Sequence, residues 1–314
     1  MTYEHVPVMV EEVLELLSLR PGACVLDATL GLGGHAIEIA RRLGPKGTLI
    51  GLDRDPELLK RARARLLPDE GVPQESAEFR LFHARFSGLR EVVAAAGETH
   101  VDGVLLDLGV CSAHLDEPER GFRFTSGSEE VPLDMRLERT CTEESAAELL
   151  LRVDEQELVA ILRAGEVPAA QRVAREIRAR LPLRSAHELE AASRAAKLPR
   201  RRHHPATLVF QALRIAVNRE FEELEHALEA SLEVLSPGAR LVVLSYHSGE
   251  DRRVKNFIRR EQQGCICPPR LPVCGCGHSP RMRALGRMRK PSEDEVRANP
   301  RARSARLRAA ERQE

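Results

Sequence analysis

Four side chains suited to binding a small charged molecule follow hydrophobic runs in the first third of the chain. They are Asp27, Asp53, Phe86 and Asp107. Asp53 stands twenty-two residues after Gly31, and an acidic side chain at that distance from a glycine turn can bind the hydroxyls of a ribose. Phe86 can stack against a purine. Any one of these carboxylates can equally cap the helix that follows it. The four together favour a pocket for a nucleoside.

The glycine turn that follows Asp27 does not by itself identify the nucleoside. Gly31, Gly33 and Gly34 permit a tight turn and a close approach of the backbone to a ligand. Gly31-x-Gly33-x-x-Ala36 also fits the dinucleotide fingerprint, so a dehydrogenase remains a rival. A carboxylate at Asp27 repels a pyrophosphate and attracts the amino and sulfonium groups of S-adenosylmethionine. We therefore predict an S-adenosylmethionine-dependent methyltransferase.

The elements that position these side chains alternate between strand and helix from Cys24 to Gly109. This alternation predicts an α/β fold with a Rossmann-like parallel sheet, in which all four side chains lie at the carboxyl edge. Residues 114–205 contain only helical patterns, and a strand pattern returns at 239–247 after one long helix over 207–235. We expect a methyltransferase domain in two parts, 1–113 and 206–314 with a basic tail, and an inserted helical substrate-recognition domain, 114–205.

Polar and basic clusters near this edge are candidates for contact with the substrate. SYHSGED, residues 245–251, follows the last expected strand and offers Tyr246, His247 and Asp251. Arginines cluster at five further positions, although ion pairs or a solvated loop would also explain them. These positions are Arg120, Arg123, Arg200, Arg201 and Arg202. Aromatic residues make up only 3% of the chain, so arginine must carry most of any grip on nucleic acid.

The overall composition excludes some classes of protein. The formal net charge is zero, but residues 281–314 carry eleven basic and five acidic side chains. No apolar stretch is long enough to span a bilayer, and the first residues lack the pattern of a secretory signal, so we expect a cytoplasmic protein. Four cysteines permit zinc, a disulfide or simple loop packing, and we expect no metal because their spacing is narrow for zinc. These are Cys265, Cys267, Cys274 and Cys276.

Long motifs along nearly the whole chain resemble those of the bacterial 16S ribosomal RNA cytosine-N4 methyltransferases, the RsmH or MraW family. They include HVPVMVEE, DATLGLGGH, LIGLDRDP, DGVLLDLGV, RGFRF, PLDMR, HPATLVFQALRIAVNRE, SYHSGEDRRVK and PSEDEVRANPRARSARLR. The resemblance implies S-adenosylmethionine as methyl donor. It also implies, as the substrate, a cytidine of 16S rRNA in the decoding region, at the P site of the small ribosomal subunit. A homodimer is left open.

The resemblance also assigns residues. The family's cofactor positions fall on Gly33, Gly34, His35, Asp53, Phe86, Asp107 and His114. Relatives usually have glutamine where His114 stands, serine where Cys111 stands, and SFHSLED in place of SYHSGED. The lone pair of the cytosine amino group is delocalised into the ring, so catalysis needs an acceptor for the amine and precise positioning more than a strong base. We expect Asp107 to orient the donor or the amine, and Tyr246, His247 and Asp251 to position the base.

Overall fold

The computed structural model describes residues 7–67, 76–123, 131–197, 205–265, 267, 273 and 275–314. The chain forms two compact units. The sheet unit comprises Met1–Gly109 and Glu223–Glu314, and the helical unit comprises Val110–Glu222. The expected insertion ended at residue 205. The structure extends the helical unit to Glu222 because helix α10 (Pro205–Val217) contributes Val209 and Leu213 to the core of that unit.

The sheet unit is built on a seven-stranded sheet of order β3-β2-β1-β4-β5-β7-β6. Its strands are β1 (Cys24–Asp27), β2 (Thr48–Asp53), β3 (Glu78–His83), β4 (Val101–Asp107), β5 (Leu235–Ser245), β6 (Met282–Ala284) and β7 (Arg306–Arg312). The first five strands are parallel, and β7 is antiparallel to both β5 and β6. The predicted α/β, Rossmann-like sheet is confirmed. The strand order reverses between β1 and β4, which is where open α/β sheets bind ligands.

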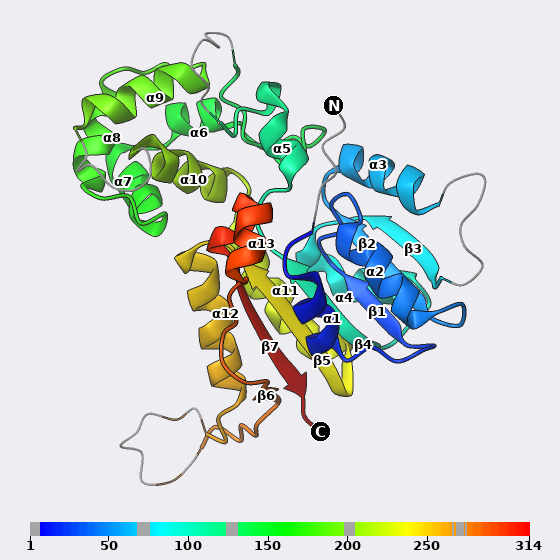
Figure 1. Ribbon diagram of the computed structural model, residues 1–314. Coiled ribbons are helices and arrows are strands. Elements are labelled where there is room, and N and C mark those ends of the chain that lie inside the picture. Colours follow the sequence, from blue (N-terminus) through cyan, green and yellow to red (C-terminus); the bar gives the residue numbers. More distant parts are fainter. Residues whose placement is uncertain are drawn as a thin grey trace. The chain divides into compact units, whose positions relative to one another are not determined.

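Helices cover both faces of this sheet (Figure 1). Val25 and Leu105 pack against α1 (Val10–Leu17), α2 (Gly34–Leu43) and α3 (Pro56–Leu66). Their chain neighbours Leu26 and Leu106 pack on the opposite face, against α4 (Leu89–Ala95), α11 (Glu220–Val234) and α12 (Ser248–Glu261). Because successive side chains of a strand point to opposite faces, a strand buried on both sides must be apolar throughout. Only the strand ends are therefore free to carry polar groups.

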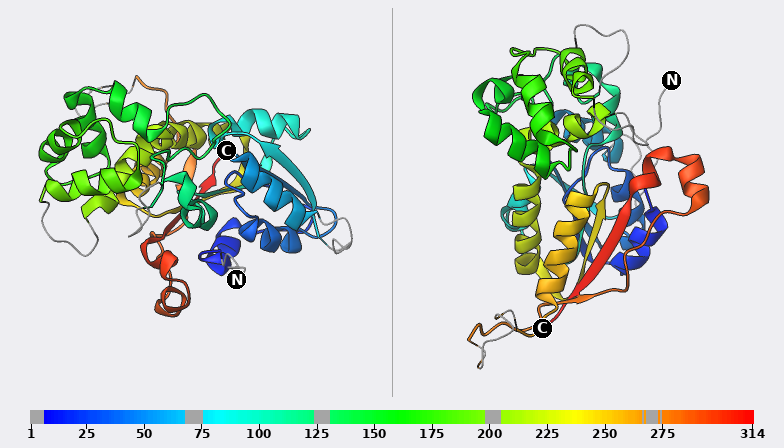
Figure 2. Two further views of the ribbon diagram at one scale, coloured as in Figure 1. Left: turned by 90° about the horizontal axis from the view of Figure 1, so that it is seen from above. Right: turned by 90° about the vertical axis from the view of Figure 1, so that its left-hand side faces the viewer.

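The C-terminal segment is not the free basic tail that the sequence suggested. Residues 282–312 form β6, α13 (Glu293–Ala298), the 3₁₀ helix η3 (Pro300–Ser304) and β7. Figure 2 shows β7, in red, lying along β5, in yellow, and six residue pairs join the two strands from Arg240–Glu311 to Ser245–Arg306. Leu307 and Ala310 are fully buried in the sheet. Alanines supply most of the buried face of β7, so its apolar pattern was too weak to predict a strand.

The helical unit has its own core. Its elements are α5 (Ser112–Asp116), the 3₁₀ helix η2 (Pro118–Arg120), α6 (Ala146–Arg152), α7 (Glu155–Ala164), α8 (Ala170–Arg178), α9 (Ala186–Ala195) and α10. The inserted, all-helical part of the predicted fold is thus confirmed. Within the described residues of this unit, the only β contact is an isolated bridge between Pro132 and Ser185. In the described part of the chain, no helix is long and apolar enough to cross a membrane.

The single long helix expected over residues 207–235 is two helices, α10 and α11. The chain breaks at Arg219, whose φ of 50° lies in the left-handed region. The preceding residue, Asn218, explains the break. Its side-chain amide donates to the Met135 carbonyl (2.7 Å) and accepts from the Leu137 N–H (2.9 Å). These bonds join segments more than eighty residues apart, so no local pattern could reveal them.

Candidate active site

The reversal point of the sheet carries a chain of hydrogen bonds between two strand ends. Asp27 ends β1, and one of its oxygens accepts from the Thr29 N–H (3.1 Å). The Thr29 hydroxyl in turn accepts from the Asp107 N–H at the end of β4 (2.6 Å). Asp27 is 1% exposed. Burial raises its pKa to about 6, although the nearby His35 ring opposes the rise. Asp27 is therefore a buried negative charge that changes state close to neutral pH.

The glycine turn places His35 at the same edge. Gly33 has φ 78° and precedes α2, and a side chain on Gly34 would press within 3.1 Å of Pro7. The His35 Nε2 lies 2.9 Å from the Val8 carbonyl, which can only accept, so Nε2 carries the proton of that bond. The other ring nitrogen, Nδ1, lies 3.6 Å from an oxygen of Asp107. The buried ring of His35 is thereby fixed between Val8, which precedes α1, and the end of β4.

Asp53 ties the glycine turn to the end of β2. One oxygen accepts from the Gly31 N–H (2.8 Å) and the other from the Asp55 N–H (2.8 Å). A carboxylate oxygen can accept more than one hydrogen bond, so both atoms keep capacity for ribose hydroxyls. Phe86 follows β3 and opens the 3₁₀ helix η1 (Phe86–Gly88), half-buried. The structure thus gathers Asp27, Asp53 and Asp107 at one edge, on neighbouring strands, as the sequence predicted.

Tyr246 brings a hydroxyl to Asp107 from the end of β5. Its Oη donates to Asp107 Oδ1 at 2.8 Å. Burial, together with the negative charge of Asp107, raises the pKa of Tyr246 well above its usual value, so the phenol stays a neutral donor. Gly109 leaves room beside the ring, since a Cβ there would lie 3.7 Å from Tyr246 Cδ2. Tyr246 and His35 therefore contact different oxygens of Asp107, and the two side chains together fix the position of the carboxylate.

The two other predicted substrate residues of this segment are engaged in structural contacts. His247 caps α12, with Nδ1 accepting from the Glu250 N–H (3.4 Å) and Nε2 3.0 Å from Glu250 Oε1. Asp251 accepts from Arg308 (2.7 Å) and Arg306 (3.1 Å) of β7. Burial alone would raise the pKa of Asp251, but the two guanidinium groups lower it. The prediction that Asp251 positions the base is corrected: its carboxylate holds α12 to β7.

His114 and Cys111, the two departures from the family pattern, belong to the helical unit and pair with each other. The Cys111 N–H donates to His114 Nδ1 (3.2 Å), and the Cys111 Sγ accepts from the Ala113 N–H (3.3 Å). This reciprocal arrangement is a capping box for α5. The buried His114 ring also lies 5.7 Å from the ring of Phe122. The two substitutions thus preserve the start of α5 together.

The predicted arginine contacts divide into three cases. Arg120 is 1% exposed, donates to Glu117 (2.6 Å) and to the Leu137 carbonyl (3.3 Å), and so cannot face nucleic acid. The prediction that Arg120 contacts RNA is wrong, because its guanidinium group is buried and donates to Glu117. Arg123 is 53% exposed and lies 3.6 Å from Asp116. Arg200, Arg201 and Arg202 lie outside the described residues.

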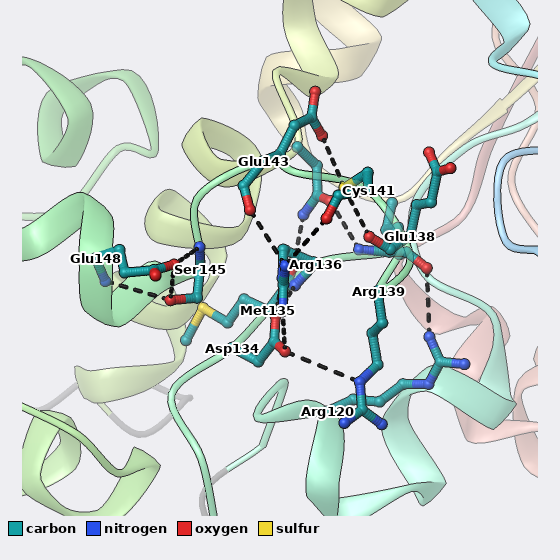
Figure 3. Close-up of polar contacts among 12 residues, drawn as sticks. Arg120, Asp134, Met135, Arg136, Glu138, Arg139, Cys141, Glu143, Ser145 and Glu148 are labelled. Atoms are coloured by element: carbon teal, nitrogen blue, oxygen red, sulfur yellow. Dashed lines mark hydrogen bonds and ion pairs between the residues drawn. The ribbon is translucent and has the colours of Figure 1, made fainter.

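The side chains of the PLDMR motif, residues 132–136, form hydrogen bonds within their own loop (Figure 3). Arg136 binds both oxygens of Asp134, at 2.7 and 3.0 Å, and donates to the carbonyls of Cys141 and Glu143. The hydrogen bonds that Arg136 donates to Asp134 raise the pKa of Arg136. Met135 between them has φ 63°, a left-handed conformation that the paired neighbours hold in place. Arg136 therefore forms an ion pair within its own loop.

A basic hollow of about 330 Å³ lies elsewhere on the sheet unit, and the sequence did not predict it. Its lining side chains are Lys255, Ile258, Arg259, Gln262, Gln263, Ala284, Arg287, Met288, Arg308 and Ala309, with Gly286. No acidic side chain is among them. Lys255 and Arg259 are four residues apart, about one helical turn, so their spacing in the sequence indicates that they share one face of α12. Arg287 comes from the segment after β6, and only the fold brings it to the same place.

Comparison with known proteins agrees with this geometry. The model of the MraW methylase family matches residues 2–313. The chain is 48% identical to "Ribosomal RNA small subunit methyltransferase H" of Geobacter sulfurreducens, with 99% of each chain covered. It is 46% identical to the protein of the same name in Pelobacter propionicus, with 98% of each covered. The solved structure of an rRNA methylase from Streptococcus thermophilus is 12% identical with a TM-score of 0.42, covering 100% of this chain and 99% of that one, too remote to inform the site.

Proposed function

Because the chain belongs to the MraW methylase family, we propose that it methylates N4 of a cytidine in the decoding region of 16S ribosomal RNA. The use of S-adenosylmethionine follows from family membership. The ribosomal RNA is supported by the name that the relatives carry, ribosomal RNA small subunit methyltransferase H. The proposal also specifies the details of the reaction. The target is the N4 atom of the P-site cytidine, the substrate is the small ribosomal subunit, and the protein acts in the cytoplasm.

The observation that carries the proposal is the acidic carboxyl edge of β1, β2 and β4. Asp53 accepts hydrogen bonds from the ribose hydroxyls, since it lies at the end of β2 beside the glycine turn and a carboxylate oxygen can accept more than one hydrogen bond. Asp27 supplies a buried negative charge next to the glycine turn, which favours a cationic donor over a diphosphate. The family resemblance implies further cofactor contacts by Phe86, His114, His35 and the glycines at positions 33 and 34, and the glycine turn itself adds Gly31. S-adenosylmethionine supplies an activated methyl group on its sulfonium.

Asp107 and Tyr246 are proposed to act on the amine. An Asp107 oxygen accepts an N–H of the cytosine amino group, which favours the pyramidal nitrogen whose lone pair can attack. The Tyr246 hydroxyl and the backbone bond to Thr29 hold the carboxylate in place. Because these groups are fixed before reaction, they stabilise the positive charge that develops on the nitrogen without rearranging. The proton becomes acidic only after the methyl group has moved, so no strong base is required beforehand.

The RNA contacts are proposed to use cations that are exposed. Lys255, Arg259 and Arg287 line the basic hollow, where no carboxylate competes with a phosphate. No aromatic side chain lines it, which suits contact with the sugar–phosphate backbone and not stacking with bases. Arg123 offers a further exposed cation on the helical unit. These contacts offset the cost of unstacking the target cytidine, a few kcal/mol.

The decisive experiment follows the methyl group. Small ribosomal subunits from a strain without this modification are incubated with the enzyme and isotopically labelled S-adenosylmethionine, and the RNA is digested to nucleosides. We expect label in N4-methylcytidine from a decoding-region fragment of 16S rRNA. Label at a carbon atom of cytosine, or in a different region of the RNA, would refute the assignment. A reaction without enzyme serves as the control.

A further inference from the structure

The connection between α12 and β6 is anchored where it leaves α12 and where it returns to the sheet. The described residues between Glu261 and Met282 contain no helix or strand, and Val273 is 76% exposed. The base of the loop is pinned by buried Glu261. Its carbonyl accepts from the Arg281 N–H (2.8 Å) and its side chain from Arg281 Nε (2.6 Å).

Three thiols converge in this connection. The Sγ atoms of Cys265, Cys267 and Cys276 all lie within 4.8 Å of one another. The Cys265 and Cys276 sulfurs are 3.8 Å apart, far beyond the roughly 2.05 Å of a disulfide bond. A zinc ion that binds thiolates at about 2.3 Å in tetrahedral geometry separates its sulfurs by about 3.8 Å. The 3.8 Å between the Cys265 and Cys276 sulfurs is therefore the distance expected for two thiolates on one zinc ion, and the Cys267 sulfur lies within 4.8 Å of both.

A second contact fits metal-bound thiolate. The Cys267 N–H donates to the Cys265 Sγ at 3.4 Å. Metal ligands are commonly oriented by hydrogen bonds from their surroundings, and a thiolate is a better acceptor than a thiol. This contact comes from the loop backbone itself and aims the sulfur inward toward the other two. The hydrogen bond from the Cys267 N–H to the Cys265 sulfur is thus of the kind that orients the ligands of a structural metal site.

Simple packing does not explain the cluster. Cysteine that serves as a small hydrophobic side chain is normally buried, whereas Cys265 and Cys276 are exposed. His278 is not a competing ligand, because its Nδ1 lies 2.9 Å from the Gln263 carbonyl and its Nε2 3.6 Å from Glu261. The histidine belongs to the base of the loop, with Glu261. The three thiols therefore form a group separate from that base.

We propose that Cys265, Cys267 and Cys276 bind a structural zinc ion that joins the two sides of the connection between α12 and β6. Soft thiolates favour zinc among the common divalent ions. The three thiolates supply three of the four ligands of a tetrahedral zinc site. The sequence favoured no metal because one residue is a narrow spacing within a pair. The structure removes that objection, because Cys276 joins the other two from the returning side of the loop.

The proposed site is separate from the methyltransferase site. His247 caps the first turn of α12, beside the carboxyl end of β5, whereas Cys265 follows the last turn of the same helix. The fourteen-residue helix spans about 21 Å between these ends. The zinc ion is therefore structural, and its loss should leave cofactor binding intact. This expectation makes the inference independent of the proposed RNA substrate.

Metal analysis tests the inference directly. The full chain, without a histidine tag, is purified in reductant and passed through gel filtration before elemental mass spectrometry. We expect about one zinc ion per chain. The Cys265→Ser/Cys276→Ser double variant should hold at least tenfold less zinc, and the matched control Cys141→Ser, a cysteine of the helical unit, should hold as much as the wild type.

A measurement on the wild type alone guards against misfolding of the double variant. A mercurial thiol reagent should release the zinc into a colorimetric indicator, and cobalt should give the visible bands of a tetrahedral thiolate complex. S-adenosylhomocysteine should bind the zinc-depleted protein with unchanged affinity in a calorimetric titration. Wild-type protein free of zinc after growth in zinc-supplemented medium, iron in its place, or full zinc in the double variant would each overturn the proposal.

Discussion

The carboxyl edge of the sheet and the basic hollow beside α12 belong to one unit but have opposite chemistry. Asp27, Asp53 and Asp107 gather at the first, whereas Lys255, Arg259 and Arg287 line the second. Where an acid and basic side chains do lie together, they form ion pairs. Arg306 and Arg308 bind the carboxylate of Asp251 and neutralise its charge. A protein that handles a cationic donor and a polyanionic substrate must keep its acids and bases apart. The following predictions test this separation.

The largest effect is expected from Asp107→Ala. The substitution removes the acceptor for the amine and leaves the buried Tyr246 hydroxyl without its partner. Turnover should fall about 10²–10³-fold, the usual cost of removing one fixed electrostatic group from an active site. Single-turnover rates with saturating donor measure this. Asp102→Asn, at the other end of β4, is the matched control and should retain the wild-type rate. Equal rates for both variants would remove Asp107 from the mechanism.

The next largest effect concerns RNA binding at the basic hollow. Lys255→Ala, Arg259→Ala and Arg287→Ala should each weaken binding and lower the slope of log affinity against log salt by about one unit. The affinity for S-adenosylhomocysteine should not change. Filter binding of a 16S rRNA fragment at several salt concentrations measures the slope. Lys46→Ala, an exposed lysine in the turn after α2, is the control. If the triple variant keeps the wild-type slope, the hollow does not contact RNA.

A smaller effect is expected from the ionisation of Asp27. Burial raises its pKa to about 6, so in the free protein the group is neutral below that pH and negative above it. A cationic donor favours the negative form, and its affinity should therefore rise about tenfold between pH 5 and pH 7.5. Calorimetry across this range measures the rise, which Asp27→Asn should abolish. An affinity that falls with pH in the wild type would contradict the assigned charge.

The same ionisation has a predictable effect on stability. Because the folded protein binds the Asp27 proton more tightly than the unfolded chain, the contribution is fully present below pH 4 and is lost as the pH rises through about 6. The shift corresponds to at most roughly 3 kcal/mol. Denaturant unfolding at pH 4.5 and pH 7.5 should show Asp27→Asn gaining stability relative to wild type at the higher pH. An equal difference at both values would argue against the raised pKa.

The smallest effect is expected from Tyr246→Phe. The change removes one hydrogen bond to Asp107 and preserves the buried ring beside Gly109. Since a hydrogen bond to a charged group contributes about 1.5–3 kcal/mol and the Thr29 and His35 contacts remain, we expect a loss near the lower limit, about tenfold in turnover. A pre-steady-state rate measurement with unchanged donor affinity would support the positioning role. A loss as large as that of Asp107→Ala would mean that the hydroxyl itself takes part.

The site in the sheet unit could be predicted because its signals are local. Glycines, an apolar run and an acid at the right interval specify a strand, a turn and a helix within thirty residues, and the rule for parallel sheets then brings the strand ends together. Asp27, Asp53 and Asp107 follow from this reasoning alone. The helices α6 to α9 were also recognisable, because proline and glycine separate them and their apolar spacing is regular.

The remaining features depend on contacts between distant segments. Nothing near Arg120 in the sequence shows that the Leu137 carbonyl will accept from it, and nothing near Asp251 points to the arginines of β7. The strand β7 is short of large apolar residues and gains its place only by pairing with β5. The basic hollow and the thiol cluster likewise require segments that meet only in the folded chain. In each case a tertiary partner, and not the local pattern, sets the role.

The central claim is that the acidic edge selects a cationic methyl donor over a dinucleotide. Calorimetric titration of the wild-type protein with S-adenosylmethionine and, separately, with NAD tests it most directly. We expect a single site for S-adenosylmethionine and no detectable heat of binding for NAD. Saturable binding of NAD, with none of S-adenosylmethionine, would contradict the account.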